Sequence, residues 1–197
     1  MSSTSSTVRT FVALPLSREV AQALSEVQRC LREYLREEGE VRWVHPSRFH
    51  VTLAFIGDLP RFEIPALTEG IAAKTRGIAP FSFTLAHLGA FPSLARPQVL
   101  WIGVEEGVEP LSRLAEAVRA GVRDAVGWRG GEERFIPHVT LGRTKRRWGR
   151  LGEGAAACVP APVGPQRAGR VVVYASRLTP QGAIYHELSH VDLEASQ

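Results

Sequence analysis

His50-Val51-Thr52-Leu53 occurs twice in this chain, and the second copy is His138-Val139-Thr140-Leu141. Each copy lies in an apolar, β-branched run, residues 49–56 and 136–141, which predicts a β-strand. Successive side chains of a strand point to opposite faces, so the histidine and threonine of each copy share one face and the valine and leucine share the other. The apolar pair can therefore anchor each strand to a core while the imidazole and hydroxyl point outward together.

The strongest indication of a functional site in the sequence is that this tetrapeptide occurs twice. A histidine on a half-buried strand is usually a hydrogen-bonding residue with no further role, and threonine is a good strand former. One His-x-Thr triplet would be unremarkable, whereas two identical tetrapeptides in strand-like runs are much harder to obtain by chance. Two such strands facing each other across a groove would present two imidazoles and two hydroxyls to one ligand.

The composition is that of an ordinary globular protein. The chain has 197 residues, of which 44% are hydrophobic and 22% are charged, and this length allows one domain or two small lobes. The net charge of +4 suits an anionic ligand such as phosphate or RNA without requiring one. Cys30 and Cys158 form neither a disulfide framework nor a metal-binding spacing, so we expect two reduced thiols in a cytoplasmic protein. No apolar run is long enough to predict a membrane span.

The hydrophobic periodicity predicts an α+β fold with a mainly antiparallel central sheet and helices packed outside. Predicted strands cover residues 9–16, 41–44, 49–56, 80–88, 99–104, 136–141, 170–176 and 183–193, and predicted helices cover 18–38 behind the N-cap Ser17, 63–75 and 109–126. Residues 1–7 are expected to be a disordered tail, and 57–60, 89–97 and 152–169 to be turns or loops. Each half supplies a long helix followed by a His-x-Thr strand, which predicts an internal duplication about a pseudo-twofold axis within one domain, residues 8–193.

With both tetrapeptides in place, the chain resembles the 2H phosphoesterase superfamily, named for two His-x-Thr/Ser motifs. It is most similar to the RNA 2′,3′-cyclic phosphodiesterases, historically called 2′-5′ RNA ligases. The matching stretches are residues 9–16, 49–57, 88–91, 99–103, 137–143 and 174–189. The resemblance implies a bilobal fold whose two antiparallel sheets form a V-shaped cleft holding the four motif side chains. It also implies hydrolysis of RNA 2′,3′-cyclic phosphate ends to 2′-phosphates with no metal and no cofactor.

The motif residues suit this chemistry on their own terms. Opening a cyclic phosphodiester needs a base to activate water and an acid to protonate the departing ribose oxygen, and two histidines can fill both roles near neutral pH. The hydroxyls of Thr52 and Thr140 can donate to the non-bridging phosphate oxygens. The resemblance assigns His50 as the proton donor toward O3′ and His138 as the proton acceptor. The sequence alone does not decide which histidine is the proton donor and which is the acceptor. In the reverse reaction, an ATP-independent ligation, the two histidines would exchange these roles.

Arg143 follows the second motif and matches an arginine of the family pattern, so we expect it to contact phosphate. Strict strand alternation argues against this role, because it places Arg143, at an odd position, on the face opposite the motif histidine and threonine, at even positions. Arg143 reaches the cleft only if Gly142 breaks the alternation. The basic run at residues 145–150 is read as a solvated loop, with contact to the RNA backbone as the alternative. Trp148 within it is read as packing on its own lobe rather than stacking on a base.

The expected partner is RNA with a 2′,3′-cyclic phosphate end, tRNA halves among the candidates, bound by a monomer with no membrane association. Two alternatives remain. One is a phosphodiesterase for 2′-5′ oligonucleotides or a small cyclic phosphate, and the other is a non-catalytic module that binds RNA ends. Intact His50 and His138 argue against the binding module, since binding alone needs no matched acid and base. No set of zinc ligands, no lysine-bearing phosphate loop and no serine elbow is found in the sequence.

Overall fold

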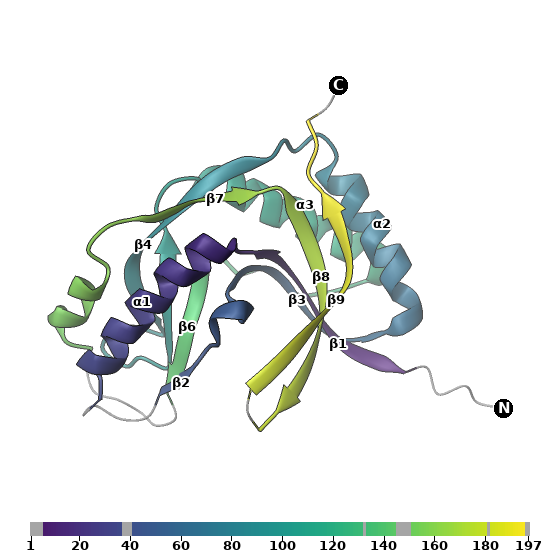
Figure 1. Ribbon diagram of the computed structural model, residues 1–197. Helices are drawn as coiled ribbons and strands as arrows, with labels where there is room; N and C mark the ends of the chain where they lie inside the picture. The colour runs from purple at the N-terminus through teal and green to yellow at the C-terminus, as the bar shows by residue number, and fades with distance from the viewer. Residues whose placement is uncertain (1–5, 37–40, 132, 145–150, 181, 196–197) are drawn as a thin grey trace.

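A computed structural model describes residues 6–36, 41–131, 133–144, 151–180 and 182–195. Across these residues one curled antiparallel sheet of nine strands runs through the molecule, with three α-helices packed against it (Figure 1). The predicted α+β class is confirmed. Of the predicted tail, residues 1–5 lie outside the described residues, whereas Thr7 already begins the first strand. Within the described ranges, no helix is both long and apolar enough to cross a membrane.

The sequence order of the elements follows the predicted one closely. The strands are β1 (Thr7–Pro15), β2 (Val41–Trp43), β3 (His50–Pro60), β4 (Phe81–Phe91), β5 (Val99–Val104), β6 (His138–Thr144), β7 (Val163–Ala168), β8 (Arg170–Thr179) and β9 (Gly182–Asp192). The helices are α1 (Arg18–Tyr34), α2 (Ile64–Thr75) and α3 (Val108–Val126), with 3₁₀ turns η1 (Pro46–Arg48), η2 (Arg61–Glu63) and η3 (Glu153–Cys158). Ser17 caps α1 as predicted, since its side chain accepts a hydrogen bond from the amide of Val20.

Several predicted boundaries are wrong because pairing between strands overrides local turn signals. β3 continues through Gly57 to Pro60, where it pairs with the start of β1, and β4 continues to Phe91, where it pairs with β5. The segment 152–169, predicted as a surface loop, contains η3 and β7, and β7 pairs with β4. Helix α1 ends at Tyr34 rather than near residue 38; residues 37–40 lie outside the described residues.

The two motif strands lie side by side in the middle of the sheet. Its order is β7-β4-β5-β6-β3-β1-β8-β9, with β2 also pairing with β6. β3 and β6 are antiparallel and are joined at Val51↔Val139, the same position of the two tetrapeptides. Outward from this pair the order is β3, β1, β8, β9 on one side and β6, β5, β4, β7 on the other, which is the predicted pseudo-twofold arrangement. The two sheets implied by the resemblance are therefore two halves of one sheet that meet at a single residue pair.

Both motif strands carry a β-bulge immediately after the threonine. The pairing of β3 with β1 skips Leu53, and the pairing of β6 with β5 skips Leu141. A bulge adds one residue and reverses the alternation beyond it. Phe55 and Arg143 are therefore returned to the face that carries the motif histidines, and they are the first exposed residues of their strands.

Each bulge is fixed by a side chain from a helix that crosses from the other half of the sheet. Gln28 of α1, which follows β1, donates through Nε2 to the Leu141 carbonyl at 3.0 Å and to the Val44 carbonyl at 2.8 Å. Arg119 of α3, which follows β5, donates through Nε to the Leu53 carbonyl at 3.0 Å. In Figure 1 α1 overlaps the half of the sheet that contains β6, and the hydrogen bond of Gln28 to the Leu141 carbonyl places it against that half. The two halves are interlocked because each bulge depends on the opposite helix.

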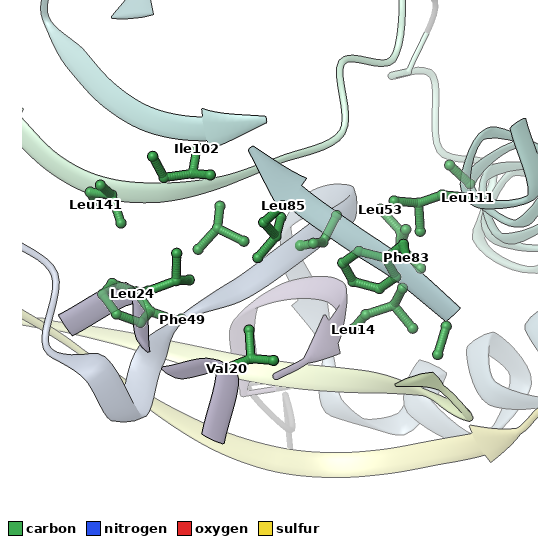
Figure 2. Close-up of a cluster of buried hydrophobic side chains, with 14 of the residues drawn as sticks. Leu14, Val20, Leu24, Phe49, Leu53, Phe83, Leu85, Ile102, Leu111 and Leu141 are labelled. Atoms are coloured by element: carbon green, nitrogen blue, oxygen red, sulfur yellow. The ribbon is translucent and has the colours of Figure 1, made fainter. Parts of the chain in front are cut away.

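The valine and leucine of each tetrapeptide anchor its strand, as predicted. All four side chains are completely buried, and burying a side chain of this size contributes about 1.5–3 kcal/mol. Figure 2 shows Leu53 and Leu141 in one buried cluster with side chains from β1, α1, β4, β5 and α3, among them Leu14, Val20, Leu24, Phe83, Leu85, Ile102 and Leu111. The motif strands are thus held from their apolar side, and the imidazole side remains open.

The prediction of two reduced thiols is wrong. Cys30 of α1 and Cys158 at the end of η3 form a disulfide, with their Cα atoms 5.6 Å apart. The two cysteines are 128 residues apart in sequence, so only the fold, which brings η3 against α1, reveals the pairing. The cysteine argument for a cytoplasmic location is lost with it.

Replacing Gln28 by methionine should lower the free energy of unfolding by about 2 kcal/mol, because the Val44 carbonyl loses its side-chain donor and the Leu141 carbonyl keeps only the Val44 amide. Gln22→Met is the matched control, since Gln22 is exposed on the same helix and should change stability by less than about 0.5 kcal/mol. Denaturant unfolding of both variants checks this. Equal unfolding midpoints would show that Gln28 does not hold the β6 bulge.

Candidate active site

The register at the centre of the sheet brings the two motifs together crosswise. With Val51 opposite Val139, the antiparallel pairing sets His50 across from Thr140 and Thr52 across from His138. The four polar side chains are partly exposed, whereas the intervening valines and leucines are buried. Each imidazole therefore has the hydroxyl of the opposite motif as its neighbour.

Both imidazoles are oriented by the same hydrogen bond. Nδ1 of His50 lies 2.7 Å from the Arg48 carbonyl, and Nδ1 of His138 lies 2.7 Å from the Ile136 carbonyl. A carbonyl only accepts, so Nδ1 carries a hydrogen in each ring and Nε2 is the nitrogen left for a ligand. A neutral ring then offers a base at Nε2, and a protonated ring offers an acid at the same atom.

Aromatic rings enclose the two imidazoles, a feature that no pattern in the sequence indicated. The ring centroids of Phe11 and Tyr185 lie 5.1 and 5.4 Å from that of His50, and those of Phe91 and Trp101 lie 5.0 and 5.7 Å from that of His138. These rings limit the rotation of each imidazole and exclude water from its faces. In each ring Nδ1 is held by a carbonyl, and Nε2 has no hydrogen-bond partner among the described residues.

Burial lowers the pKa of both histidines. For His50 desolvation is the main cause, the hydrogen bond to the Arg48 carbonyl partly opposes it, and the nearby His138 lowers the pKa further. For His138 desolvation again comes first, the Ile136 carbonyl opposes it, and the charge of Arg143 lowers the pKa further. Both rings are therefore neutral at pH 7 without a ligand, and a bound anion favours protonation of one of them.

Three connected hollows surround the motif residues. The central cavity, about 420 Å³, is lined by His50, Thr52, Thr140, Arg143 and Tyr185 among others. The His50-side cavity, about 1100 Å³, shares His50 and Tyr185 with it and adds Arg18, Tyr174 and Arg177. The His138-side cavity, about 680 Å³, shares Thr52 and Phe55 with the central cavity and adds Phe91, Trp128, Arg129 and Arg134. A ligand in the central cavity thus has a large space beside each imidazole.

Comparison with known proteins identifies the family of this chain. A family profile described as "LigT like Phosphoesterase" matches residues 14–101. An RNA 2′,3′-cyclic phosphodiesterase of Thermotoga maritima is 31% identical over 192 residues, covering 95% of this chain and 96% of that protein.

This chain belongs to the LigT-like 2H phosphoesterase family.

Solved structures of the family share the fold. The crystal structure of TT0787 of Thermus thermophilus superposes with a TM-score of 0.77 at 32% identity, covering 96% of this chain and 100% of that one. Escherichia coli LigT in its apo form has a TM-score of 0.73 at 23% identity, covering 94% of this chain and 97% of that one, a likeness of fold.

In this LigT-like phosphoesterase, the bulge at Leu141 brings Arg143 to the central cavity. The break in alternation lies where Gly142 follows the bulged residue, and a side chain at Gly142 would meet Val41 Cγ1 at 2.6 Å. Phe55 occupies the equivalent position after the first motif, with the Arg9 guanidinium 4.9 Å from its ring centroid. When the two tetrapeptides are aligned, Phe55 and Arg143 fall at the same position. This equivalence could have been recognised from the sequence.

The basic run 145–150, including Trp148, lies outside the described residues.

Arg48 and Tyr185 are further cavity residues that sequence reasoning missed. Arg48 donates from Nη1 to the Ala183 carbonyl, which ties the turn before β3 to the β8–β9 hairpin. Burial raises the pKa of Tyr185, against the lowering effect of Arg48 and Arg143, so its phenol stays protonated at neutral pH and can donate to a phosphate oxygen.

No group of three or more His, Cys, Asp or Glu able to hold a metal ion occurs among the residues that the structure describes.

Arg143→Gln should raise the pKa of His138, because the positive charge that disfavours its protonation is removed. The pKa of His50 should not rise, since Arg143 is not among the causes of its shift and a more readily protonated His138 would lower it. Histidine NMR titration of the ligand-free protein measures both. Arg143→Lys should keep the pKa of His138 low. An unchanged pKa of His138 in Arg143→Gln would contradict this account of the site.

Proposed function

We propose that this phosphoesterase hydrolyses RNA 2′,3′-cyclic phosphate ends to 2′-phosphomonoesters without a metal ion, using His50 and His138 as acid and base. The observation that carries the proposal is the matched pair of imidazoles, each with Nδ1 on a carbonyl and Nε2 free for a ligand, on two antiparallel strands. The names of relatives at about 30% identity, RNA 2′,3′-cyclic phosphodiesterases, support the same substrate.

The reaction needs proton transfers on opposite sides of phosphorus. His138 accepts a proton from water at Nε2 as the water oxygen bonds to phosphorus. The bond from phosphorus to O3′ breaks, and His50 donates its proton to O3′, leaving the phosphate on O2′. The assignment of acid and base follows the family pattern. The antiparallel motif strands support an in-line geometry, because they set the ring of His50 against the central cavity and the ring of His138 against the adjacent His138-side cavity.

The residues around the phosphate would stabilise the charge that grows in the transition state. The hydroxyls of Thr52 and Thr140 can donate to the non-bridging oxygens, and the guanidinium of Arg143 and the phenol of Tyr185 line the same cavity. A bound phosphate anion would also raise the pKa of a neighbouring imidazole, which supplies the protonated partner that the ligand-free site lacks.

The dimensions of the site favour RNA over a small cyclic phosphate. The central cavity alone, about 420 Å³, could hold a cyclic phosphate group, whereas the His50-side cavity of about 1100 Å³ offers space and basic side chains for further nucleotides. Both imidazoles come from one chain, which supports activity as a monomer. A cytoplasmic location, with tRNA halves among the candidate substrates, now rests on the RNA substrate and not on the cysteines.

A short RNA ending in a 2′,3′-cyclic phosphate, incubated with the protein in EDTA, should give a 2′-phosphate end. Mass spectrometry and resistance to a 3′-specific phosphatase identify the product. His50→Ala and His138→Ala should each lower kcat by at least about 10²–10⁴, the usual size of an acid–base contribution. Unchanged binding of the RNA by these variants controls for misfolding. A 3′-phosphate product, or full activity in either variant, would contradict the assignment.

The pH profile of kcat/KM should be bell-shaped, with both limbs below the ordinary histidine pKa of about 6.5. The reason is that kcat/KM reports the free protein, in which the pKa of both histidines is lowered. The kcat profile should lie at higher pH, because bound phosphate favours the protonated ring. Steady-state rates across the range from about pH 4.5 to about pH 9 measure both. An alkaline limb of kcat/KM above the ordinary value would contradict the burial of the acid.

A further inference from the structure

The central cavity and the His50-side cavity carry positive charge with no opposing carboxylate. Five arginines line the two cavities between them, namely Arg9, Arg18, Arg48, Arg143 and Arg177. Among the residues that the structure describes, no Asp or Glu lines either cavity. The His138-side cavity differs, because Glu133 lies among its three arginines. The His50 side therefore favours an anion that is longer than a single phosphate group.

The proposed reaction determines the direction in which the RNA leaves the central cavity. In-line attack places the entering water opposite O3′, with the water beside His138 and O3′ beside His50. O3′ belongs to the ribose of the reacting nucleotide, and the 5′ phosphodiester of that nucleotide is attached to the same ribose. We therefore expect the rest of the strand on the His50 side.

The His50-side cavity has room for more than the reacting nucleotide. Its volume of about 1100 Å³ lies at the upper end of the range typical of sites for small ligands. It adjoins the central cavity of about 420 Å³, where the reacting phosphate would lie beside Thr52 and Thr140. A nucleoside that carries only a cyclic phosphate would leave much of this space, and its arginines, unused.

Arg48 lies where the two cavities meet. Four residues line both cavities, namely Arg48, His50, Ala183 and Tyr185. The guanidinium of Arg48 donates through Nη1 to the Ala183 carbonyl and lies against Gly182, where a Cβ would be 2.7 Å from Nη1. Because a guanidinium has five N–H groups, this contact leaves donors for a phosphate oxygen that passes from one cavity to the other.

Arg18 and Arg177 line the His50-side cavity from two different elements. Arg18 is the first residue of α1, and Arg177 belongs to β8 and is paired with Ile184 of β9. Both arginines are exposed, and both line the cavity that adjoins Arg48. Guanidinium groups bind phosphate oxygens through charge-assisted hydrogen bonds. The three arginines thus suit a phosphate next to the reacting nucleotide.

We propose that Arg18 and Arg177, with Arg48 at the junction, bind the phosphodiester on the 5′ side of the reacting nucleotide. The protein therefore prefers RNA ends to free nucleoside 2′,3′-cyclic phosphates, which have no such phosphodiester. This inference rests on the proposed hydrolysis and on His50 as the proton donor toward O3′.

Two dinucleotides of equal length test this second phosphate site. Both end in a 2′,3′-cyclic phosphate and carry a 2′-O-methyl group on the 5′ ribose, which protects the internal linkage. That linkage is a phosphodiester in one and an uncharged methylphosphonate in the other. The unaltered protein should hydrolyse the phosphodiester form with a kcat/KM about tenfold higher than that of either methylphosphonate diastereomer, because only the charged linkage attracts the arginines.

Arg18→Gln/Arg177→Gln should lower kcat/KM for the phosphodiester form by about tenfold and change that for the methylphosphonate forms by less than about twofold. The preference for the charged linkage should therefore disappear. Arg48 is kept in this variant, because it also ties β9 to the turn before His50. Arg129→Gln/Arg134→Gln removes the same charge from the His138-side cavity and should retain the preference.

Equal kcat/KM values for the two linkages in the unaltered protein would overturn the inference. A preference that survives Arg18→Gln/Arg177→Gln would also overturn it, as would one that is lost in Arg129→Gln/Arg134→Gln, which would place the strand on the His138 side. In each of these cases the cyclic phosphate is still hydrolysed, so the proposed function stands. Absence of hydrolysis of both dinucleotides would instead reject the proposed function, and the inference with it.

Discussion

The arrangement of the site depends on one residue pair, Val51 opposite Val139, through which the two halves of the sheet are joined. Because the paired residues are equivalent and the strands are antiparallel, every motif side chain has a twofold-related counterpart. The two imidazoles therefore lie in twofold-related positions, with His50 across from Thr140 and His138 across from Thr52. A one-residue slip of either motif strand would turn its histidine toward the core, so the register here is strongly constrained. We propose that residues 8–193 act as one domain because neither half completes the site.

The matched bulges extend this symmetry from the motifs to the cavities. Each bulge leaves a leucine carbonyl that is bound by a side chain of a helix from the other half, the buried Gln28 or the half-buried Arg119. Beyond the bulges the symmetry is broken chemically: the equivalent positions hold Arg143 and Phe55. Arg143 lines the central cavity, and Phe55 lines both the central and the His138-side cavity. Equivalent bulges therefore expose a charged side chain after one motif and an aromatic side chain after the other.

The sequence predicted the features that repeat and missed those that depend on contacts between distant segments. The motif strands, their alternation and the helix faces follow from periodicity, and they are confirmed. The disulfide between Cys30 and Cys158 and strand β7 depend on partners far away in sequence, so no local pattern reveals them. The position of Arg143 could be stated only as a condition on Gly142, because a bulge is invisible to a rule of strict alternation. The rings around each imidazole come from neighbouring strands and could not be assigned either.

The central claim is that the two imidazoles act from opposite sides of phosphorus in one displacement. Hydrolysis of a single diastereomer of a ribonucleoside 2′,3′-cyclic phosphorothioate in ¹⁸O-labelled water tests it directly, with the configuration at phosphorus determined in the product. One in-line attack predicts complete inversion. Retention would require two successive displacements, as through a phosphohistidine, and would contradict the roles given to His50 and His138.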